Sequence, residues 1–560
     1  MAVTTPTRPL SNPEIAHRLV AYAHLLQSRG ENPFKVRAYR RAASTIKGLR
    51  ENVAQLARSH ADLTRFPGIG KGIAGAVREI VLSGTLGQLE LPLTEAPPEM
   101  AVVNEYPGLD PKRVARVFKG LRIDTLAALK DRFESGAIRA AFGPRMEDHF
   151  RSAFRDSTLI LLDDADALAA ELKAYLLARC GAKRVEGAGE LRRRVEAVSE
   201  IALVVETDDF PALRSRLAKF RGGIDLIETA NRDATFQLPG SVMVTVHAAT
   251  AANWGTALVV ATGSAAHVEE LEKVGGLSRS ARTEEVAYTS VGLKWVPPEL
   301  REGRGEVAQA ARGELPELVE LGDVRGDLHM HTTASDGIDT IEAMAEAARE
   351  RGYAYIGITD HSQSLRIARG VSIAALRTQI RRIDKLNGGL SGIRILKSAE
   401  VDILADGSLD YPDDLLAELD YTICSIHSRF RLGKQEQTER ILRAMDHPAF
   451  TILGHATGRL ILHRSGYELD LPRLIAHAKA RRCYFEINAD PDRLDLAPDH
   501  VREVAKAGIK VAIGTDAHRA AGLEYMRCGI DVARRAGLTR KQVLNCLPLP
   551  GLLRGLRKAG

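Results

Sequence analysis

The sequence contains few cysteines and no long apolar run. Five of its 560 residues are cysteine, and they lie far apart with no C-x-x-C pair. This spacing argues against a disulfide framework or a zinc ribbon and is typical of a reducing cytoplasm. The first residues, MAVTTPTRPLSN, lack the apolar core of a signal peptide, and no segment is long enough to span a bilayer. We therefore expect a cytoplasmic protein that makes no membrane contact.

The chain also lacks a large excess of either charge. Its 78 Lys and Arg outnumber its 72 Asp and Glu, which gives a formal net charge of +6. Such a mildly basic balance permits a polyanionic partner without demonstrating one. The length of 560 residues predicts several domains, each large enough to form its own core.

What the sequence does contain is a repeated pattern in roughly its last 240 residues. Seven apolar, β-branched runs each lead into a His or carboxylate side chain. In CYFEIN, for example, this side chain is Glu486. The runs are VRGDLHMH, YAYIGITDH, IRILKSAEVDI, YTICSIH, FTILGHATG, CYFEIN and KVAIGTDAH. Helical stretches such as TIEAMAEAARERG separate them. This alternation predicts β-α units wound into a barrel.

Most of the polar residues that end these runs share one topological position. Catalytic groups of such barrels lie at the carboxyl ends of the strands, so these side chains should gather at one rim. A single His at a strand end is more often structural than a metal ligand. Six His with three carboxylates at equivalent positions indicate instead a cluster of divalent metals. These nine residues are His329, His331, Asp336, His361, Glu400, His427, His455, Asp516 and His518.

The same motifs resemble a known family. DLHMHT, the following SDG, TDHS, AEVDIL, SIHS, GHATGR and GTDAH are similar to the PHP (polymerase and histidinol phosphatase) metal-dependent phosphoesterases. The resemblance implies a distorted seven-stranded barrel with up to three Mn²⁺ or Zn²⁺ ions, held by the nine residues above. It also implies catalytic roles for Glu400, Asp516 and His518. Arg429 and Arg459 could grip a phosphate in a fork, and we count Arg459 with the catalytic residues.

The N-terminal part predicts a compact helical region that binds DNA. Residues 12–90 read as four helices, with FPGIGKGIA between the last two. Gly68 and Gly70 permit a tight turn with positive φ, which leaves backbone N–H groups pointing outward at the start of a helix. This helix-hairpin-helix is a phosphate cradle that reads no base sequence. The basic residues that we expect beside DNA are Lys35, Arg40 and Lys71.

A second and weaker hairpin follows in YPGLDPKRVARVF, residues 106–118. Gly108 begins its turn, but Asp110 stands where the second glycine would be. A carboxylate there would repel a phosphate, although Lys112 partly offsets the charge. We therefore expect Gly108 and Lys112 to contact DNA less closely than the first hairpin does.

Taken together, the segments resemble a bacterial family X DNA polymerase that carries a C-terminal PHP domain. ENPFKVRAYRRAA is similar to the DNA-end-binding domain of that family. The resemblance covers nearly the whole chain and implies a multidomain fold of the α+β and α/β classes. The implied parts are a helical DNA-binding domain (1–90), a fingers-like hairpin region (91–150), a nucleotidyltransferase-like palm (151–240), a thumb-like domain (241–316) and the PHP (βα)7 barrel (322–560).

The palm is where the sequence departs from this family. Gly189, Arg192 and Arg193 persist in AGELRRRVEAVSEIALVVE. The serine that would bind a triphosphate is replaced by Glu190. The three metal carboxylates of the family fall at Glu200, Ala202 and Thr245. Because Mg²⁺ tolerates an incomplete oxygen cage poorly, we expect neither Mg²⁺ nor a dNTP to bind this vestigial site, and nucleotidyl transfer should be lost.

Three hypotheses follow. The first is a DNA-repair enzyme that binds gapped or broken duplexes without sequence preference and acts as a metal-dependent 3′-5′ exonuclease, or as a phosphoesterase at abasic sites or 3′ ends. The second is a small-molecule phosphatase of histidinol-phosphate type, which would leave the hairpins unexplained. The third is a DNA-binding scaffold without catalysis, against which the complete set of metal ligands argues.

Overall fold

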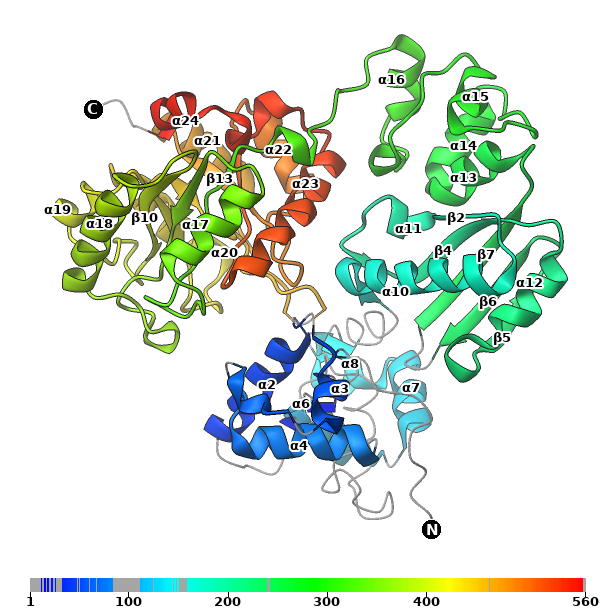
Figure 1. The fold of residues 1–560 in the computed structure, drawn as a ribbon, viewed down its shortest axis with the longest axis horizontal. Coiled ribbons are helices and arrows are strands. Elements are labelled where there is room, and N and C mark those ends of the chain that lie inside the picture. The colour runs from blue at the N-terminus through cyan, green and yellow to red at the C-terminus, as the bar shows by residue number, and fades with distance from the viewer. Residues whose placement is uncertain are drawn as a thin grey trace. The chain divides into compact units, whose positions relative to one another are not determined.

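The structure is a computed structural model that describes part of residues 12–26, most of 33–83 and 111–150, and 159–556 apart from 239–241 and 463. The chain divides into two compact units, Met1–Ser157 and Thr158–Gly560. The described part of the first unit is helical, whereas the second contains two large sheets with their helices (Figure 1).

Three of the four helices predicted near the N-terminus are present in the first unit. They are α2 (Pro33–Lys47), α3 (Val53–Arg58) and α4 (Lys71–Ser83). Asn52 caps α3 by accepting a hydrogen bond from the backbone N–H of Gln55, as expected for this residue type. The remaining predicted helix, the first in the chain, falls on positions that are only partly described. The helices α6 (Pro111–Leu121), α7 (Leu126–Glu134) and α8 (Ala137–Phe142) follow.

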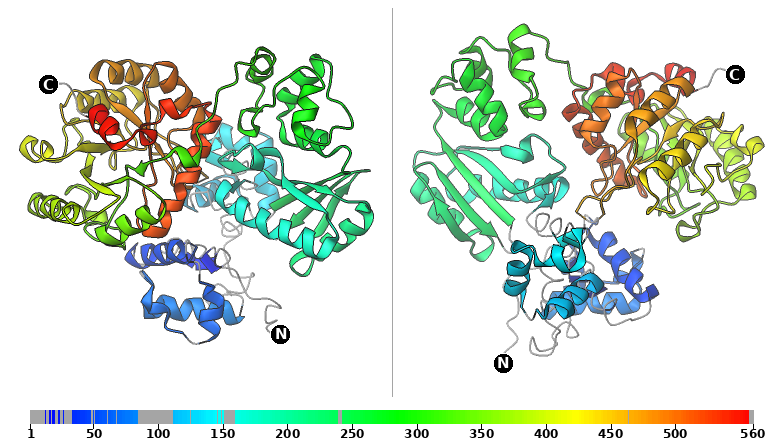
Figure 2. Two further views of the ribbon diagram at one scale, coloured as in Figure 1. Left: turned by 45° about the horizontal axis from the view of Figure 1, so that its top comes forward. Right: turned by 180° about the vertical axis from the view of Figure 1, so that it is seen from behind.

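A five-stranded sheet with the order β2-β4-β7-β6-β5 forms the first part of the second unit. Its strands are β2 (Arg184–Gly187), β4 (Glu200–Glu206), β5 (Asp225–Thr229), β6 (Asp233–Leu238) and β7 (Val242–Ala249). Alternation along β4 places Ile201 and Leu203 in one core with residues of α10 (Leu162–Tyr175) and α12 (Phe210–Leu217). The other face packs against α13 (Trp254–Thr262). Figure 2 shows the sheet from both sides.

The predicted boundary between palm and thumb at residue 240 does not match this sheet. β6 and β7 pair antiparallel on either side of that position, and β7 lies between β4 and β6. Because β7 belongs to the same sheet as β6, the sheet extends to Ala249. The part predicted to be thumb-like contains α13, α14 (Ala265–Lys273), α15 (Glu284–Thr289) and α16 (Glu306–Arg312).

The last part of the chain is the predicted barrel of parallel strands. All seven predicted runs contain a strand, in the order β14-β13-β12-β11-β10-β9-β8. They are β8 (Gly326–Asp327), β9 (Tyr355–Ile358), β10 (Arg394–Asp402), β11 (Tyr421–Ser425), β12 (Ile452–Leu453), β13 (Tyr484–Asn488) and β14 (Val511–Gly514). A helix follows each strand: α17 (Ile341–Glu350), α18 (Ile373–Asn387), α19 (Asp413–Leu416), α20 (Lys434–Met445), α21 (Leu471–Arg481), α22 (Pro498–Lys506) and α23 (Met526–Arg535).

Hydrogen bonds beyond the ends of β8 and β14 nearly close the barrel. The backbone N–H of His331 donates to the carbonyl of Ala517 over 2.8 Å, and that of Asp516 donates to the carbonyl of His329 over 2.9 Å. These bonds tie together two segments that carry four of the nine predicted ligands. The inner core contains Leu328, Ile423 and Ile452, and α24 (Leu549–Leu556) packs against it. Within the described residues, no helix is both long and apolar enough to cross a membrane.

Candidate metal centre

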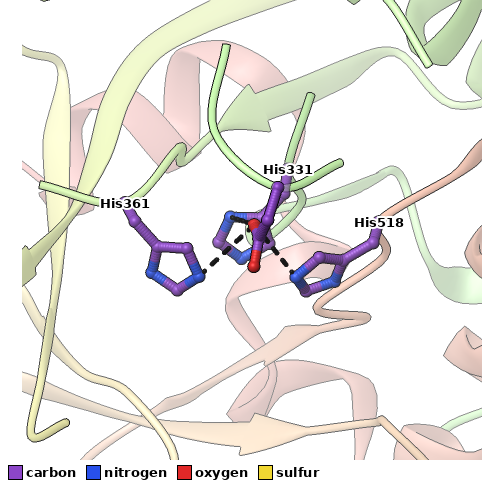
Figure 3. A group of neighbouring side chains, drawn as sticks. His331, His361 and His518 are labelled. Atoms are coloured by element: carbon purple, nitrogen blue, oxygen red, sulfur yellow. Dashed lines mark ion pairs between the residues drawn. The ribbon is translucent and has the colours of Figure 1, made fainter. Parts of the chain in front are cut away.

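The nine predicted ligand residues converge at the carboxyl ends of the barrel strands. Their donor atoms form three overlapping groups, in each of which all donors lie within 4.8 Å of one another. One group contains His331, Asp336, His361 and His518, and Figure 3 shows its three histidines around one carboxylate. The others are His329, His331 and Asp516, and His361, Glu400 and His427. The ninth residue, His455, joins through Glu400.

Glu400 lies at the centre of this cluster. It comes from the end of β10, the longest strand of the barrel, and its side chain is 1% exposed. Its carboxylate oxygens lie 2.7 Å from Nδ1 of His361, 2.8 Å from Nε2 of His455 and 3.3 Å from Nε2 of His427. The remaining close nitrogens belong to His329 and His331, each at 3.6 Å. One carboxylate therefore faces five imidazoles, as a bridge between metal ions would.

The donor set fits divalent metal ions. Nε2 of His329, Nδ1 of His331, Nδ1 of His361 and Oε2 of Glu400 are buried and have no hydrogen-bond partner among the described residues. Nδ1 of His361 and Oε2 of Glu400 lie close together, but their orientation does not make a hydrogen bond. Buried polar atoms without partners are costly. Imidazole and carboxylate donors that point at one another in this way are the ligands that Zn²⁺ and Mn²⁺ take.

A second layer of acceptors orients the histidines. Glu486 accepts from Nδ1 of His329 over 2.6 Å, and Asp402 accepts from Nδ1 of His427 over 2.5 Å. Acceptors behind a ligating His fix its tautomer and direct the other nitrogen at the metal. Glu486 ends one of the seven runs but was not among the nine predicted ligands, and Asp402 was not singled out. The sequence signal for both is a carboxylate at or near a strand end.

Two of the nine residues have unusual backbone conformations. His455 has φ +23° and Asp516 has φ +54°. Residues with side chains rarely adopt positive φ, and such strain persists where the surrounding structure enforces it. Asn488 holds Asp516 by donating to its Oδ2 over 3.0 Å, and Glu486 accepts from the backbone N–H of His455 over 2.7 Å.

The charges of the cluster shift its pKa values strongly. Burial works against a positive His361, but Glu400 and Asp336 outweigh burial and raise the pKa of His361 to about 10. Burial and the neighbouring His361 lower the pKa of His331 to about 4. Burial opposes charge on Glu400 as well, yet the surrounding histidines hold its pKa well below the ordinary value. A metal ion would compete with protons for these ring nitrogens, so its binding would release protons.

Arg459, which was predicted to be catalytic, binds protein acceptors that are not among the nine cluster residues. Its Nη1 forms an ion pair with Glu196 over 2.8 Å, and its Nε donates to the carbonyl of Arg493 over 2.9 Å. Its remaining nitrogen donates to the carbonyl of Leu494. Each nitrogen of the guanidinium thus has a protein acceptor. The sequence GHATGR does not reveal in which direction this side chain points. Arg429, the other candidate, is exposed.

The arginine beside the cluster is Arg493, which sequence analysis missed. Its Nε lies 3.6 Å from Oδ2 of Asp516. It belongs to the segment NADPDR, which directly follows β13. A basic residue in the loop after a barrel strand was the available signal.

In the palm, the retained arginines are bound to protein carboxylates. Arg192 forms a two-pronged ion pair with Glu284 over 2.6 and 2.8 Å, and Arg193 pairs with Glu302 over 3.1 Å. Glu200 accepts a hydrogen bond from the hydroxyl of Thr245. Gly189 has φ +54°, and a side chain there would meet Cβ of Ala202 at 3.1 Å. Glu190 accepts hydrogen bonds from the backbone N–H and the hydroxyl of Ser199.

The first hairpin turn is partly as predicted. Gly68 has φ +79°, whereas Gly70 does not have a positive φ, and its carbonyl accepts the first hydrogen bond of α4 from Ala74. Only Gly68 therefore needs glycine for its backbone conformation. The predicted DNA contacts Lys35, Arg40 and Lys71 are exposed. Gly108 and the side chain of Lys112 lie outside the described residues.

Comparison with known proteins agrees with both parts of the chain. The helix-hairpin-helix domain family matches residues 10–86, and the PHP domain family matches residues 327–537. The DNA polymerase/3′-5′ exonuclease PolX of Bacillus subtilis (strain 168) is 32% identical over 96% of this chain and 97% of its own length. A probable phosphatase of Thermoanaerobacter sp. (strain X514) is 28% identical over 39% of this chain, and one of Syntrophotalea carbinolica is 27% identical over 39%.

The barrel and its cluster of histidines and carboxylates define the C-terminal part as a metal-dependent phosphoesterase of the PHP class. Since the resemblance to PolX extends over nearly the full length of both proteins, the chain belongs to the PolX family of DNA polymerase/3′-5′ exonucleases with a C-terminal PHP domain. This confirms the family that the sequence motifs predicted.

Proposed function

We propose that this protein is a DNA-processing nuclease whose chemistry takes place in the PHP barrel. It removes nucleotides from 3′ ends with Mn²⁺ or Zn²⁺, while its palm no longer transfers nucleotides. The observation that carries this proposal is the contrast between the two sites. The nine predicted ligand residues converge in the barrel, whereas Glu200 is the one carboxylate at the three palm positions of Glu200, Ala202 and Thr245.

The barrel residues have two roles: some would bind metal ions, and others orient those ligands. We assign the nine cluster residues as ligands for up to three ions, one for each donor group. Bound there, divalent ions would supply an activated water near neutral pH and neutralise charge on a phosphodiester. Glu486 and Asp402 keep His329 and His427 in the tautomer that directs Nε2 at the cluster.

The contacts of the palm support the loss of nucleotidyl transfer. Phosphoryl transfer relies on metals and cations that are free to engage the triphosphate. Here Glu284 and Glu302 already neutralise Arg192 and Arg193. Ala202 offers no ligand to a Mg²⁺ ion, and Thr245 uses its hydroxyl to bind Glu200. We therefore infer that neither Mg²⁺ nor a dNTP binds this site.

DNA is the substrate that accounts for the N-terminal unit. The turn at Gly68 precedes α4, whose first backbone N–H groups have no partner within the helix and can bind a phosphate. Such contacts read the backbone and not the bases. We propose gapped or broken duplexes as the DNA form, with exonuclease, abasic-site and 3′-end processing as variants of one hydrolysis.

A primer assay tests the proposal. A 5′-labelled primer in a duplex with a one-nucleotide gap is incubated with the protein and Mn²⁺, with and without dNTPs. We expect shorter products that dNTPs do not change and that His329→Ala and Asp516→Ala abolish, while both variants still bind the DNA. Extension of the primer would show that the palm is active. Cleavage that persists in both variants would show that the chemistry lies elsewhere.

A small-molecule phosphatase remains the second candidate. The relatives named probable phosphatases match the barrel part of this chain, so the barrel alone would suit that activity. Release of phosphate from histidinol phosphate, without any cleavage of the gapped duplex, would favour it. A protein that binds DNA but hydrolyses neither substrate would instead be a scaffold.

A further inference from the structure

We infer that Arg493 binds the phosphate of the substrate at the Asp516 side of the metal cluster. The inference rests on the proposed phosphoesterase function and adds a substrate-binding residue to that site. It gives Arg493 the role that the sequence suggested for Arg459.

The position of Arg493 puts a positive charge at the edge of the cluster. Its Nε lies 3.6 Å from Oδ2 of Asp516, the oxygen that also accepts from Asn488. The other oxygen of Asp516 lies 2.9 Å from Nε2 of His331, inside the cluster. Arg493 and His331 thus contact the two oxygens of one carboxylate. The guanidinium therefore lies beside a predicted metal ligand, where it could contact a phosphate bound at the cluster.

The guanidinium of Arg493 has donors to spare. Among the described residues, its side chain makes no hydrogen bond, and the pair with Asp516 is its one close ionic contact. The side chain is 24% exposed, which leaves part of it open to an incoming ligand. A planar guanidinium with several unused N–H groups matches two oxygens of a phosphate.

Two neighbouring arginines are committed to other partners. Arg459 binds Glu196 and two backbone carbonyls. Arg464 donates twice to the carbonyl of Gly458 and lies over the ring of Phe430 at 4.6 Å. These contacts already hold both guanidinium groups, whereas the side chain of Arg493 has only the longer contact with Asp516 among the described residues.

The backbone around Arg493 is held firmly. Its N–H donates to the carbonyl of Asp490 over 2.8 Å, and its own carbonyl accepts from Nε of Arg459 over 2.9 Å. Since Arg459 is in turn bound to Glu196, it acts as a positioning residue for Arg493. A donor fixed before the substrate arrives contributes more than one that must first be ordered.

Two measurements on the full-length Mn²⁺-loaded protein test the inference. The first is binding of inorganic phosphate, followed by the paramagnetic relaxation of its ³¹P signal by bound Mn²⁺. The second is the kcat and KM of DNA cleavage. The variants are Arg493→Ala and Arg493→Lys. The matched control is Arg473→Ala, which removes an exposed arginine of the same barrel that pairs with Glu439.

We expect Arg493→Ala to weaken phosphate binding at least about 10-fold, as the loss of a hydrogen bond to a charged group implies. We expect it to lower kcat about 100-fold, the usual cost of a lost donor to transition-state charge. Arg493→Lys should fall between because it keeps the charge but not the fork. Added guanidinium chloride at millimolar concentration should restore part of the activity of Arg493→Ala, and Arg473→Ala should match the wild type.

Three results would count against Arg493. Unchanged phosphate binding in Arg493→Ala would overturn the inference, as would an unchanged kcat in a protein that cleaves DNA. Loss of Mn²⁺ from Arg493→Ala would show that Arg493 supports Asp516 and does not bind the substrate. If the wild type did not cleave DNA, the proposed function would fail, but the phosphate measurement would still decide the role of Arg493.

Discussion

Single carboxylates behind the cluster control how its histidines are presented. Glu486 is buried, accepts from Nδ1 of His329 and also holds the backbone of His455. It thus supports two ligands from two strands. An acceptor of this kind raises the basicity of the His ligand and fixes its tautomer.

We therefore predict that Glu486→Gln weakens metal binding or cleavage about 10- to 100-fold, the usual effect of losing an outer partner of a ligand. The variant keeps the size of the side chain but removes the charge opposite His329. Mn²⁺ titration and cleavage rates measure the effect. The control is Glu439→Gln, which changes a partly exposed side chain on α20 and should behave as the wild type. Equal metal affinity and activity in both variants would contradict the role of Glu486.

A different carboxylate, Glu284, stabilises the palm and thumb. Burial works against its charge, but Arg192 and Arg301 outweigh burial and hold the pKa of Glu284 at about 2. A carboxyl with a lowered pKa contributes stability above its ordinary pKa of about 4.3. That contribution is lost as the pH falls from about 4.3 towards the folded value.

We predict that Glu284→Gln lowers the free energy of unfolding of this region by about 3 kcal/mol at pH 7, because it leaves the buried Arg301 and the partly buried Arg192 without their partner. The difference from the wild type should shrink between about pH 4 and about pH 3, both inside that window. Urea unfolding followed by tryptophan fluorescence measures it. Both tryptophans of the chain, Trp254 and Trp295, lie in the palm and thumb, and Trp295 donates to Glu284. A difference independent of pH would refute the assigned pKa.

Site residues could be predicted where the fold fixes the direction of their side chains. The nine cluster residues converge because consecutive parallel strands bring their carboxyl ends to one rim. Arg459 and Arg493 could not be distinguished in this way. Both lie in loops, and the direction of a loop side chain depends on partners distant in sequence, such as Glu196, which lies 263 residues before Arg459.

At the scale of elements, the first hairpin allows conformation and DNA contact to be separated. Gly68 has φ +79°, and a side chain there would also meet Arg41 at 3.1 Å. Gly70 has no atoms near its would-be Cβ and no positive φ. It stands immediately before α4, where a phosphate would approach the helix.

We predict that Gly68→Ala costs about 1 kcal/mol or more in stability, since a left-handed conformation is strained for alanine. It should also weaken DNA binding. Gly70→Ala should weaken binding while changing stability less. Gly75→Ala, an exposed position inside α4, is the control and should leave DNA binding unchanged. Fluorescence anisotropy with labelled duplexes and thermal unfolding measure the two effects. Stronger or equal binding by Gly70→Ala would argue against a phosphate at this turn.

Helices and strands were predictable where a single hydrophobic periodicity dominates the segment. The seven barrel strands are short and apolar, and each is bounded by a helix with its own polar face, so the pattern predicts their order. The palm boundary at residue 240 came from the family resemblance, which does not show where a sheet ends. Only the pairing of β6 with β7 shows that one sheet continues across it.

At the scale of the molecule, the palm joins the barrel through arginines. Arg194 of the palm pairs with Asp531 of α23, and Arg527 of the same helix pairs with Asp163 and Asp166 of α10. Burial opposes the charge of Asp166, but Arg194 and Arg527 hold its pKa below the ordinary value. These ion pairs join α10 and the loop at Arg194 to α23, so this part of the chain supports the barrel whatever its own activity.

DNA binding and metal chemistry belong to different parts of the chain, so they should be separable in the intact protein. We predict that treatment with a chelator abolishes cleavage and that added Mn²⁺ restores it. The affinity for a gapped duplex should stay the same in the chelated protein, because phosphate contacts at the hairpin need no metal. The logarithm of this affinity should fall linearly with the logarithm of the salt concentration. The slope should be the same for duplexes of different sequence. Anisotropy titrations at several salt concentrations measure both. If the chelated protein lost its affinity for DNA, the barrel metals would have to be a principal DNA contact, and the division of labour between hairpin and barrel would be wrong.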